Sequence, residues 1–207
     1  MLFGLTSTSA AAIIGRRARS SSNVVEILPE AHCLSEESAN GYRQLVRTQD
    51  RSWPDRIVLP ASRWLSPEKA AELGRRVNRG CWLLVESGLV YSSRQERESQ
   101  GLVLAEAFNL QIGETIDVGA SNTSYVTYIH AQPTLVRTFG AITPICCAPA
   151  ERIAEFEGIP VAIRRRIGSG GVIFLGSILG VGLLAQEREA HRVVSALLSD
   201  LSVGGAI

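Results

Sequence analysis

A carboxylate followed by a hydroxyl and a glycine, directly after an apolar run, is the feature of this sequence best suited to chemistry. Trp82 to Val85 is apolar and stops at Glu86-Ser87-Gly88, and the residues that follow can begin a helix. A strand that ends in this way places a side chain at the carboxyl edge of a sheet, where functional groups of α/β proteins collect. Glu86 could act there as a general base or bind a sugar hydroxyl. The alternative is structural, since helix amides or an arginine stabilise an anion without any ligand.

Ser87 and His130 are the other candidate catalytic residues. A serine nucleophile would need the Gly-x-Ser-x-Gly turn, and the residues around Ser87 lack its first glycine. His130 ends a predicted strand and could face the same rim as Glu86, or it could be a half-exposed histidine without a role. The 3 histidines and 4 cysteines show no metal-ligand spacing, so we predict no metal site and no cofactor.

Three further features have both a functional and a structural interpretation. Trp64 is expected in a loop at the rim, where it could stack on a sugar. Successive residues of a strand point to opposite faces, so at most two of the arginines at 164–166 share a surface. We predict free buried thiols for all four cysteines, and a disulfide between Cys33 and Cys81 in an oxidising compartment is the alternative.

The predicted elements alternate between strands and helices. Ser66-Pro67-Glu68 supplies a capping serine, a proline at the first helical position and an acid in the first turn, which predicts a helix that ends at Arg79-Gly80. Residues 81–85 are apolar on both faces, which indicates a central parallel strand covered by helices on either side. Other strands are predicted at 24–28, 55–60, 125–130, 160–167 and 172–176, short strands and turns at 135–147, and other helices at 36–47, 92–110 and 187–201. We therefore expect an α/β three-layer sandwich with a mostly parallel sheet.

The composition favours one globular domain behind an N-terminal extension. At 207 residues and 45% hydrophobic, the chain suits one core, which we place at residues 23–207. Its formal charge of +1 offers no general attraction for nucleic acid. Residues 1–22 contain no acid and end in arginines and serines, which is typical of a targeting or disordered segment. Their apolar run is shorter than the roughly 20 residues of a membrane-spanning helix, so no integral membrane segment is expected.

The first residues, Met1 to Leu5, resemble the back half of a twin-arginine export signal, although no arginine pair precedes Phe3. This predicts export to the periplasm or the cell exterior. A mitochondrial presequence, which would place the protein in the matrix, and a cytoplasmic protein are the alternatives.

The stretch 81–93 resembles the active-site elbow of the class I glutamine amidotransferase-like superfamily, most closely that of the N-terminal domain of biotin-protein ligases. In those domains the elbow is roughly Gly-Ile-Cys-Ala-Gly followed by Ala-Tyr-Tyr-Ala-Ser. This chain keeps Gly88, Tyr91 and Ser93 but has Glu86 in place of the nucleophilic cysteine. The superfamily's His-Pro-Glu follows the final strand, and here that place is occupied by residues 176–180, Gly-Ser-Ile-Leu-Gly. The resemblance implies a flavodoxin-like fold and leaves open that its first strand is missing.

The helix before the elbow and the tail 160–176 are also similar to the trimerisation domain of family 42 β-galactosidases, a noncatalytic member of the superfamily. The joint loss of the cysteine and the histidine predicts a noncatalytic domain of an exported bacterial protein, used in ligand binding or assembly, without glutaminase activity. The alternative is a hydrolase of carbohydrates or amides centred on Glu86, and a third hypothesis is a fragment or degenerate copy. Expected partners are a small molecule or sugar and further copies of the chain. The candidate binding residues are Trp64, Glu86, Gly88 and Tyr91.

Overall fold

The computed structural model describes residues 25–31, 33–48, 55–89, 91, 93–118, 124–129 and 132–200. They form a mixed sheet of 8 strands in the order β1-β2-β3-β12-β11-β10-β6-β7. The first four strands of this order are parallel: β1 (Val25–Ile27), β2 (Arg56–Leu59), β3 (Trp82–Glu86) and β12 (Gly170–Leu175). The other four are antiparallel to their neighbours: β11 (Ile159–Ile167), β10 (Arg152–Phe156), β6 (Tyr125–Tyr128) and β7 (Thr134–Arg137).

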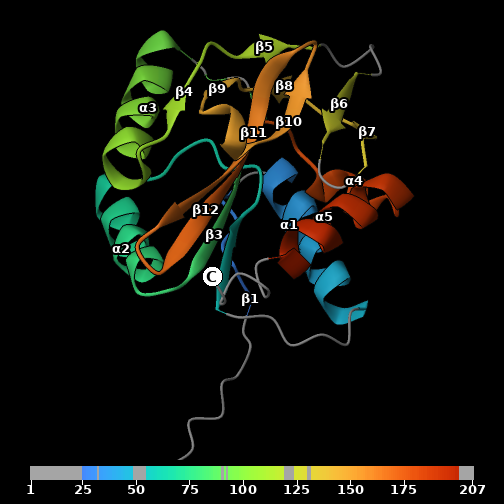
Figure 1. Cartoon of the computed structure of the whole chain (residues 1–207), viewed down its shortest axis with the longest axis horizontal. Helices are drawn as coiled ribbons and strands as arrows, with labels where there is room; N and C mark the ends of the chain where they lie inside the picture. The colour runs from blue at the N-terminus through green and yellow to red at the C-terminus, as the bar shows by residue number, and fades with distance from the viewer. Residues whose placement is uncertain are drawn as a thin grey trace, which may run out of the picture.

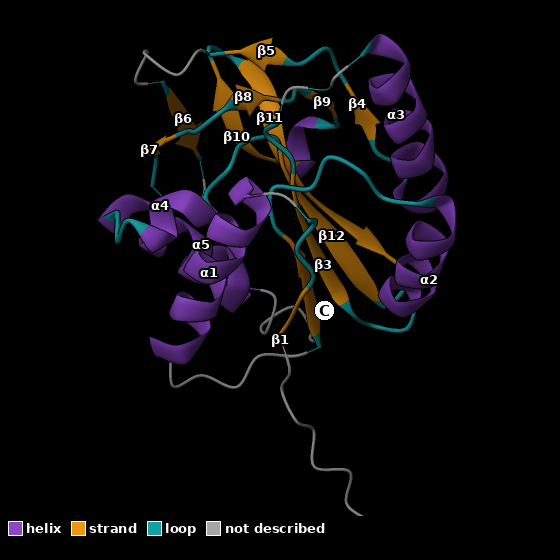
Figure 2. Cartoon of the chain, turned by 180° about the vertical axis from the view of Figure 1, so that it is seen from behind, coloured by secondary structure: helices purple, strands orange, loops and turns teal. Residues whose placement is uncertain are grey.

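Helices cover both faces of this sheet (Figures 1 and 2). One layer is α2 (Pro67–Asn78) and α3 (Arg94–Phe108), and the other is α1 (Cys33–Thr48), α4 (Gly180–Leu184) and α5 (Arg188–Asp200). Two small ribbons pair β4 (Gln111–Ile112) with β9 (Ile145–Cys146) and β5 (Ile116–Asp117) with β8 (Ala141–Ile142), and a single 3-10 turn spans Pro149–Glu151. The predicted α/β sandwich is confirmed, with parallel strands in one half of the sheet and antiparallel strands in the other.

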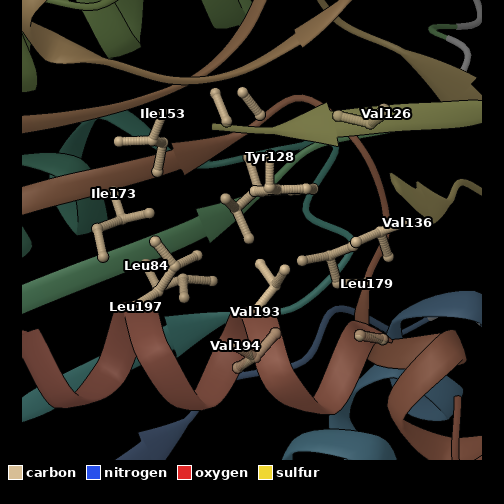
Figure 3. Packing of buried hydrophobic residues seen from close by; sticks show 14 of the residues in the cluster. Leu84, Val126, Tyr128, Val136, Ile153, Ile173, Leu179, Val193, Val194 and Leu197 are labelled. Carbon is tan, nitrogen blue, oxygen red and sulfur yellow. The ribbon is translucent and has the colours of Figure 1, made fainter. Parts of the chain in front are cut away.

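The central strand β3 separates two hydrophobic cores. Leu84 packs in the core beneath α1, α4 and α5, whereas Leu83 and Val85 pack in the core beneath α2 and α3. Figure 3 shows Val193 and Leu197 of α5 facing the strands of the first core. A strand that is apolar on both faces therefore lies between two helix layers, as its sequence predicts.

Local sequence explains several element boundaries. Ser66 caps α2, because its hydroxyl accepts from the N–H of Lys69 at 3.2 Å. A two-residue turn joins β10 to β11, in which Glu157 has φ 49° and Gly158 has φ 82°. Positive φ at both positions identifies a type I′ turn, whose twist matches that of the flanking strands. The strands predicted at 160–167 and 172–176 are confirmed, and they pair as the antiparallel strands β11 and β12.

Several elements were not predicted: β4, β5, the 3-10 turn, β10 and α4. In strand β10 the charged residues Arg152 and Glu155 are three positions apart, so the strand lacks the alternation that would have indicated it, and it lies between antiparallel neighbours. Helix α4 has only 5 residues, two of them glycine, so its propensity to form a helix is low. The targeting segment proposed at 1–22 lies outside the described residues. Among the helices of the described ranges, none combines the length and the apolarity that crossing a membrane would require.

Candidate functional site

Glu86, the last residue of β3, is completely buried, and five hydrogen-bond donors surround its carboxylate. The hydroxyls of Ser38 and Tyr42 donate to it, the latter over 3.1 Å. Three backbone N–H groups also donate, from Ala61 at 2.9 Å, Leu179 at 2.5 Å and Gly180 at 2.8 Å. All five partners are donors, so protein groups replace the water that would solvate this anion.

Helix α1 supplies the two hydroxyls because Ser38 and Tyr42 are four residues apart and therefore lie on the same face of the helix. Gly41, on that helix, lets it pack directly against the backbone of α4. A Cβ atom built at Gly41 would lie 1.9 Å from the carbonyl oxygen of Gly180, and one at Gly180 would lie 1.9 Å from the hydroxyl oxygen of Ser38. This close approach brings the hydroxyls and the α4 amides to the same carboxylate.

The backbone donors come from two loops at the carboxyl edge of the sheet. Ala61 follows β2 and has φ 43°, a left-handed conformation that is uncommon for alanine. Leu179 and Gly180 follow β12, where their N–H groups begin α4. These two residues lie in the segment that corresponds to the His-Pro-Glu of the amidotransferase-like resemblance. At this place the chain pairs the Glu86 carboxylate with the backbone amides of Leu179 and Gly180.

Burial and hydrogen bonding act on Glu86 in opposite directions. Burial raises the pKa of Glu86 above its ordinary value, and the hydrogen bonds from Ser38, Gly180, Leu179 and Ala61 oppose that rise. The pKa of Tyr42 is raised well above its ordinary value, first by burial and then by the charge of Glu86 and the hydrogen bond to it. A buried donor that loses its acceptor costs about 1–3 kcal/mol, so this network stabilises the fold only while it is complete.

The hydrogen bonds of the Glu86 carboxylate connect four segments of the chain. Glu86 joins β3 to α1, to the loop after β2 and to the start of α4. Neither carboxylate oxygen is open to solvent, since the whole residue is 0% exposed. We conclude that Glu86 is held as an internal anchor, which agrees with the structural alternative, although the amides belong to α4 rather than to the helix that follows β3.

Of the other predicted site residues that the structure describes, none donates a hydrogen bond to the Glu86 carboxylate. Ser87 is buried, and its backbone N–H donates to Leu175 at 2.7 Å. Gly88 packs where a Cβ atom would lie 2.9 Å from the carbonyl oxygen of Ala141. Trp64 is 47% exposed in the loop before α2, as expected. His130 lies outside the described residues.

Tyr91 and Ser93 lie beside the start of α3. Ser93 caps this helix by accepting from the N–H of Glu96 at 3.1 Å. Tyr91 is buried, which raises the pKa of its hydroxyl, and a hydrogen bond with the Ser87 side chain opposes that rise. The residues shared with the superfamily's elbow thus form the turn from β3 into α3.

The disulfide considered between Cys33 and Cys81 is not formed, and all four cysteines are free. Cys33 begins α1 and is exposed, whereas Cys81 is buried in the core beneath α2 and α3, on the other side of the sheet. Burial raises the pKa of the Cys81 thiol to about 11. Cys146 is exposed and Cys147 is half-buried, so the prediction of free thiols is confirmed, but the prediction of burial is confirmed for Cys81 alone among the four. The arginine run does alternate: Arg164 and Arg166 are exposed, and Arg165 binds Glu151 at 2.7 Å.

No family model matches this sequence, and no curated protein matches it. Solved structures with a similar fold include the exo-β-1,4-mannosidase Op5Man5 from Opitutaceae bacterium strain TAV5, with a TM-score of 0.64 and 15% identity over 87% of this chain and 36% of that one. Gan42B, a GH42 β-galactosidase from G. stearothermophilus, has a TM-score of 0.54 and 17% identity over 83% of this chain and 30% of that one. The cytoplasmic protein STM1381 from Salmonella typhimurium LT2 has a TM-score of 0.56 and 12% identity over 80% of this chain and 86% of that one.

This chain therefore spans about a third of each glycosidase, from 30% to 36% of its length, and most of the Salmonella protein. At these identities the similarity shows a shared fold. The similarity to family 42 β-galactosidases that the tail of the sequence predicts is confirmed at that level. The assignment to the amidotransferase-like superfamily stays a prediction.

Proposed function

We propose that this chain is a noncatalytic domain of the glutamine amidotransferase-like superfamily that functions in assembly. The observation that carries the proposal is the state of Glu86. It occupies the position of the superfamily's nucleophile, it is 0% exposed, and five internal donors take up its hydrogen-bonding capacity. A residue in this environment holds the fold together and leaves no room for a substrate at its carboxylate.

A hydrolase centred on Glu86 is the alternative, and the fold that this chain shares with part of a mannosidase and of a β-galactosidase gives it a link to carbohydrates. That hypothesis requires Glu86 to contact a substrate. Contact would need α1 to separate from α4 at Gly41 and Gly180, where their backbones meet. No observation on the described residues favours such an opening, so we prefer the noncatalytic interpretation.

The outer face of β6 and β7 supports assembly. Tyr125 and Leu135 are 49% and 60% exposed there, whereas the residues that alternate with them, Val126 and Val136, are fully buried in the core on the other face. An uncovered apolar patch on an edge of a sheet is typical of a surface that packs against another protein.

The charges on this face indicate a second copy of the same chain as the occupant. Thr127 of β6 pairs with Glu155 of β10 on one side and with Leu135 of β7 on the other. These three side chains therefore form one row across the strands. Arg137 lies opposite Tyr125 in the next row. A copy related by a two-fold rotation would place its Arg137 against Glu155 on either side of the apolar centre, in exchange for the ion pairs of Arg137 with Glu187 at 3.9 Å and of Glu155 with Arg152 at 3.2 Å. Such a surface is self-complementary.

Light scattering at several protein concentrations tests the assembly proposal. We expect the wild-type chain to associate and the Leu135→Asp variant to be monomeric with an unchanged circular dichroism spectrum. Leu102→Asp is the matched control, because Leu102 is 64% exposed on α3 and away from this face. A wild-type chain that is monomeric at every concentration contradicts the proposal, as does equal dissociation of both variants.

Turnover assays test the noncatalytic half of the proposal. We expect no hydrolysis of nitrophenyl β-galactoside, of nitrophenyl β-mannoside or of glutamine. Hydrolysis that the folded Glu86→Gln variant abolishes would establish the hydrolase instead. We further propose export of the chain, which predicts that it is recovered outside the cytoplasm when cells that express the full sequence are fractionated.

A further inference from the structure

Helices α2 and α3 lie next to each other on one face of the sheet (Figures 1 and 2), and a groove of about 370 Å³ lies between them. Small or apolar residues of both helices line it: Pro67, Ala70, Ala71, Gly74, Val103 and Ala107. A Cβ atom at Gly74 would lie 3.4 Å from the carbonyl oxygen of Ala107, so the two backbones approach closely here. Because the residues at this contact are small, the groove has room for apolar side chains of another segment.

The charges at this groove favour a basic occupant on the α3 side. Arg75 of α2 and Glu106 of α3 both line the groove, and both are exposed. Arg75 lies within electrostatic reach of Glu72 on its own helix. Glu106, in contrast, makes no ion pair with another residue of the described ranges. An apolar segment that carries an arginine at its end would therefore complement this groove in both shape and charge.

The residues that precede β1 have this composition. Residues 1–22 contain no acid, and their apolar run is followed by three arginines, at positions 16, 17 and 19. Ala10, Ile13, Ile14 and Arg17 are spaced as i, i+3, i+4 and i+7, the spacing that places side chains on one face of a helix. This pattern combines a narrow apolar face with one cation in line with it.

The start of β1 brings this segment to the groove. Glu26 of β1 binds Arg76 of α2 at 2.7 Å, so the chain that precedes Val25 leaves the sheet beside the last turns of α2. The roughly ten residues between Ile14 and Val25 span about 30 Å when extended, more than the length of about 18 Å of α2. Residues 201–207 follow α5 in the other helix layer and contain no arginine or lysine, so they do not suit the groove.

We propose that residues 10–17 bind in the α2–α3 groove of the same chain as a docked helix. Ala10, Ile13 and Ile14 pack against the small residues of both helices, and Arg17 pairs with Glu106. The docked segment covers the groove and keeps its own apolar face out of contact with other proteins until it is displaced. The proposal concerns the chain that retains its first 22 residues, and it depends neither on self-association through β6 and β7 nor on export.

Limited trypsin digestion of the full chain, followed by mass spectrometry, measures access to the bonds after Arg16, Arg17 and Arg19. Ala71→Arg places a long cation in the groove at an exposed position of α2, and we expect it to speed cleavage at these bonds about fivefold or more. Ala185→Arg is the matched control and should be cleaved like the wild type, because Ala185 is exposed at the end of α4 in the other helix layer. Equal cleavage rates for the wild type and Ala71→Arg, both with a native circular dichroism spectrum, would overturn the proposal.

A charge swap tests the pairing of Arg17 with Glu106. We expect Arg17→Glu to speed cleavage after Arg16 and Arg19, and the addition of Glu106→Arg to slow it again, because the ion pair re-forms with reversed polarity. The cleaved segment is identical in these two variants, so the sequence preference of trypsin does not affect the comparison. Cleavage that stays fast in the double variant would contradict the pairing. Protection of the wild type that disappears on dilution would show that the segment of a second copy fills the groove and would overturn docking within one chain.

Discussion

Replacing Glu86 should unfold the domain or come close to it. Glu86→Ala removes the acceptor of three backbone N–H groups, from Ala61, Leu179 and Gly180, none of which has another acceptor in this network. At about 1–3 kcal/mol for each orphaned donor, the loss is roughly 3–9 kcal/mol in total. Entry of water and removal of the cost of burying a charge reduce this, so we expect about 3–5 kcal/mol.

That loss is a large part of the roughly 5–15 kcal/mol that stabilises a typical domain. The gentler change, Glu86→Gln, keeps the shape of the side chain but turns an N–H₂ group toward one or more of the backbone donors. We expect it to cost about 1–3 kcal/mol. The same Glu→Gln replacement at an exposed position should not produce this loss of stability, because water would pair with the groups left behind.

Urea unfolding followed by circular dichroism measures these losses. Glu37→Gln is the matched control, because Glu37 is an exposed carboxylate on α1 and its replacement should change the free energy of unfolding by less than about 0.5 kcal/mol. If Glu86→Ala is as stable as Glu37→Gln, then Glu86 does not anchor the fold and the reasoning is refuted.

Three further predictions concern pH and backbone geometry. The pKa of Glu86 is raised in the folded state, so the folded protein keeps a proton on this carboxyl to a higher pH than the unfolded chain does. The resulting stabilisation is fully present below the unfolded-state pKa of about 4.3 and is lost as pH rises through the folded-state pKa. The stability difference between wild type and Glu86→Gln should therefore fall with rising pH in that window, and a difference that rises with pH would contradict the sign. Glu157→Asn should stabilise the chain by about 0.5–1 kcal/mol, since φ 49° in a type I′ turn suits asparagine, and a lower melting temperature would argue against that turn. Gly41→Ala should cost more than about 3 kcal/mol, because its Cβ would lie 1.9 Å from the carbonyl oxygen of Gly180. Gly101→Ala, in α3 with only ordinary contacts, should instead gain about 0.5–1 kcal/mol, and similar unfolding curves for these two variants would exclude the α1–α4 contact.

The parts of the fold that were predictable are those encoded locally. Ser66-Pro67-Glu68 defines the start of α2 through a cap whose partners lie within three residues. The position of β3 in the middle of the sheet follows from its composition, because a strand that is apolar on both faces needs a cover on each. Local signals do not encode α4, whose first amides are held by Glu86 from 93 and 94 residues away.

The surroundings of Glu86 could not be predicted for the same reason. Ser38 and Tyr42 are 48 and 44 residues from Glu86 along the chain, and their hydroxyls matter only once Gly41 has let α1 approach α4. The sequence places Glu86 after an apolar strand, but it does not show which backbone amides will bind its carboxylate.

A double-mutant cycle between Glu86 and Ser38 tests the anchor most directly. The free energies of unfolding of Glu86→Gln, Ser38→Ala, the double variant and the wild type give the coupling between the two groups. Because the Ser38 hydroxyl donates to the carboxylate inside the core, we expect a coupling of about 1 kcal/mol or more. Single losses that add to within about 0.3 kcal/mol would contradict the claim that Glu86 holds these segments together.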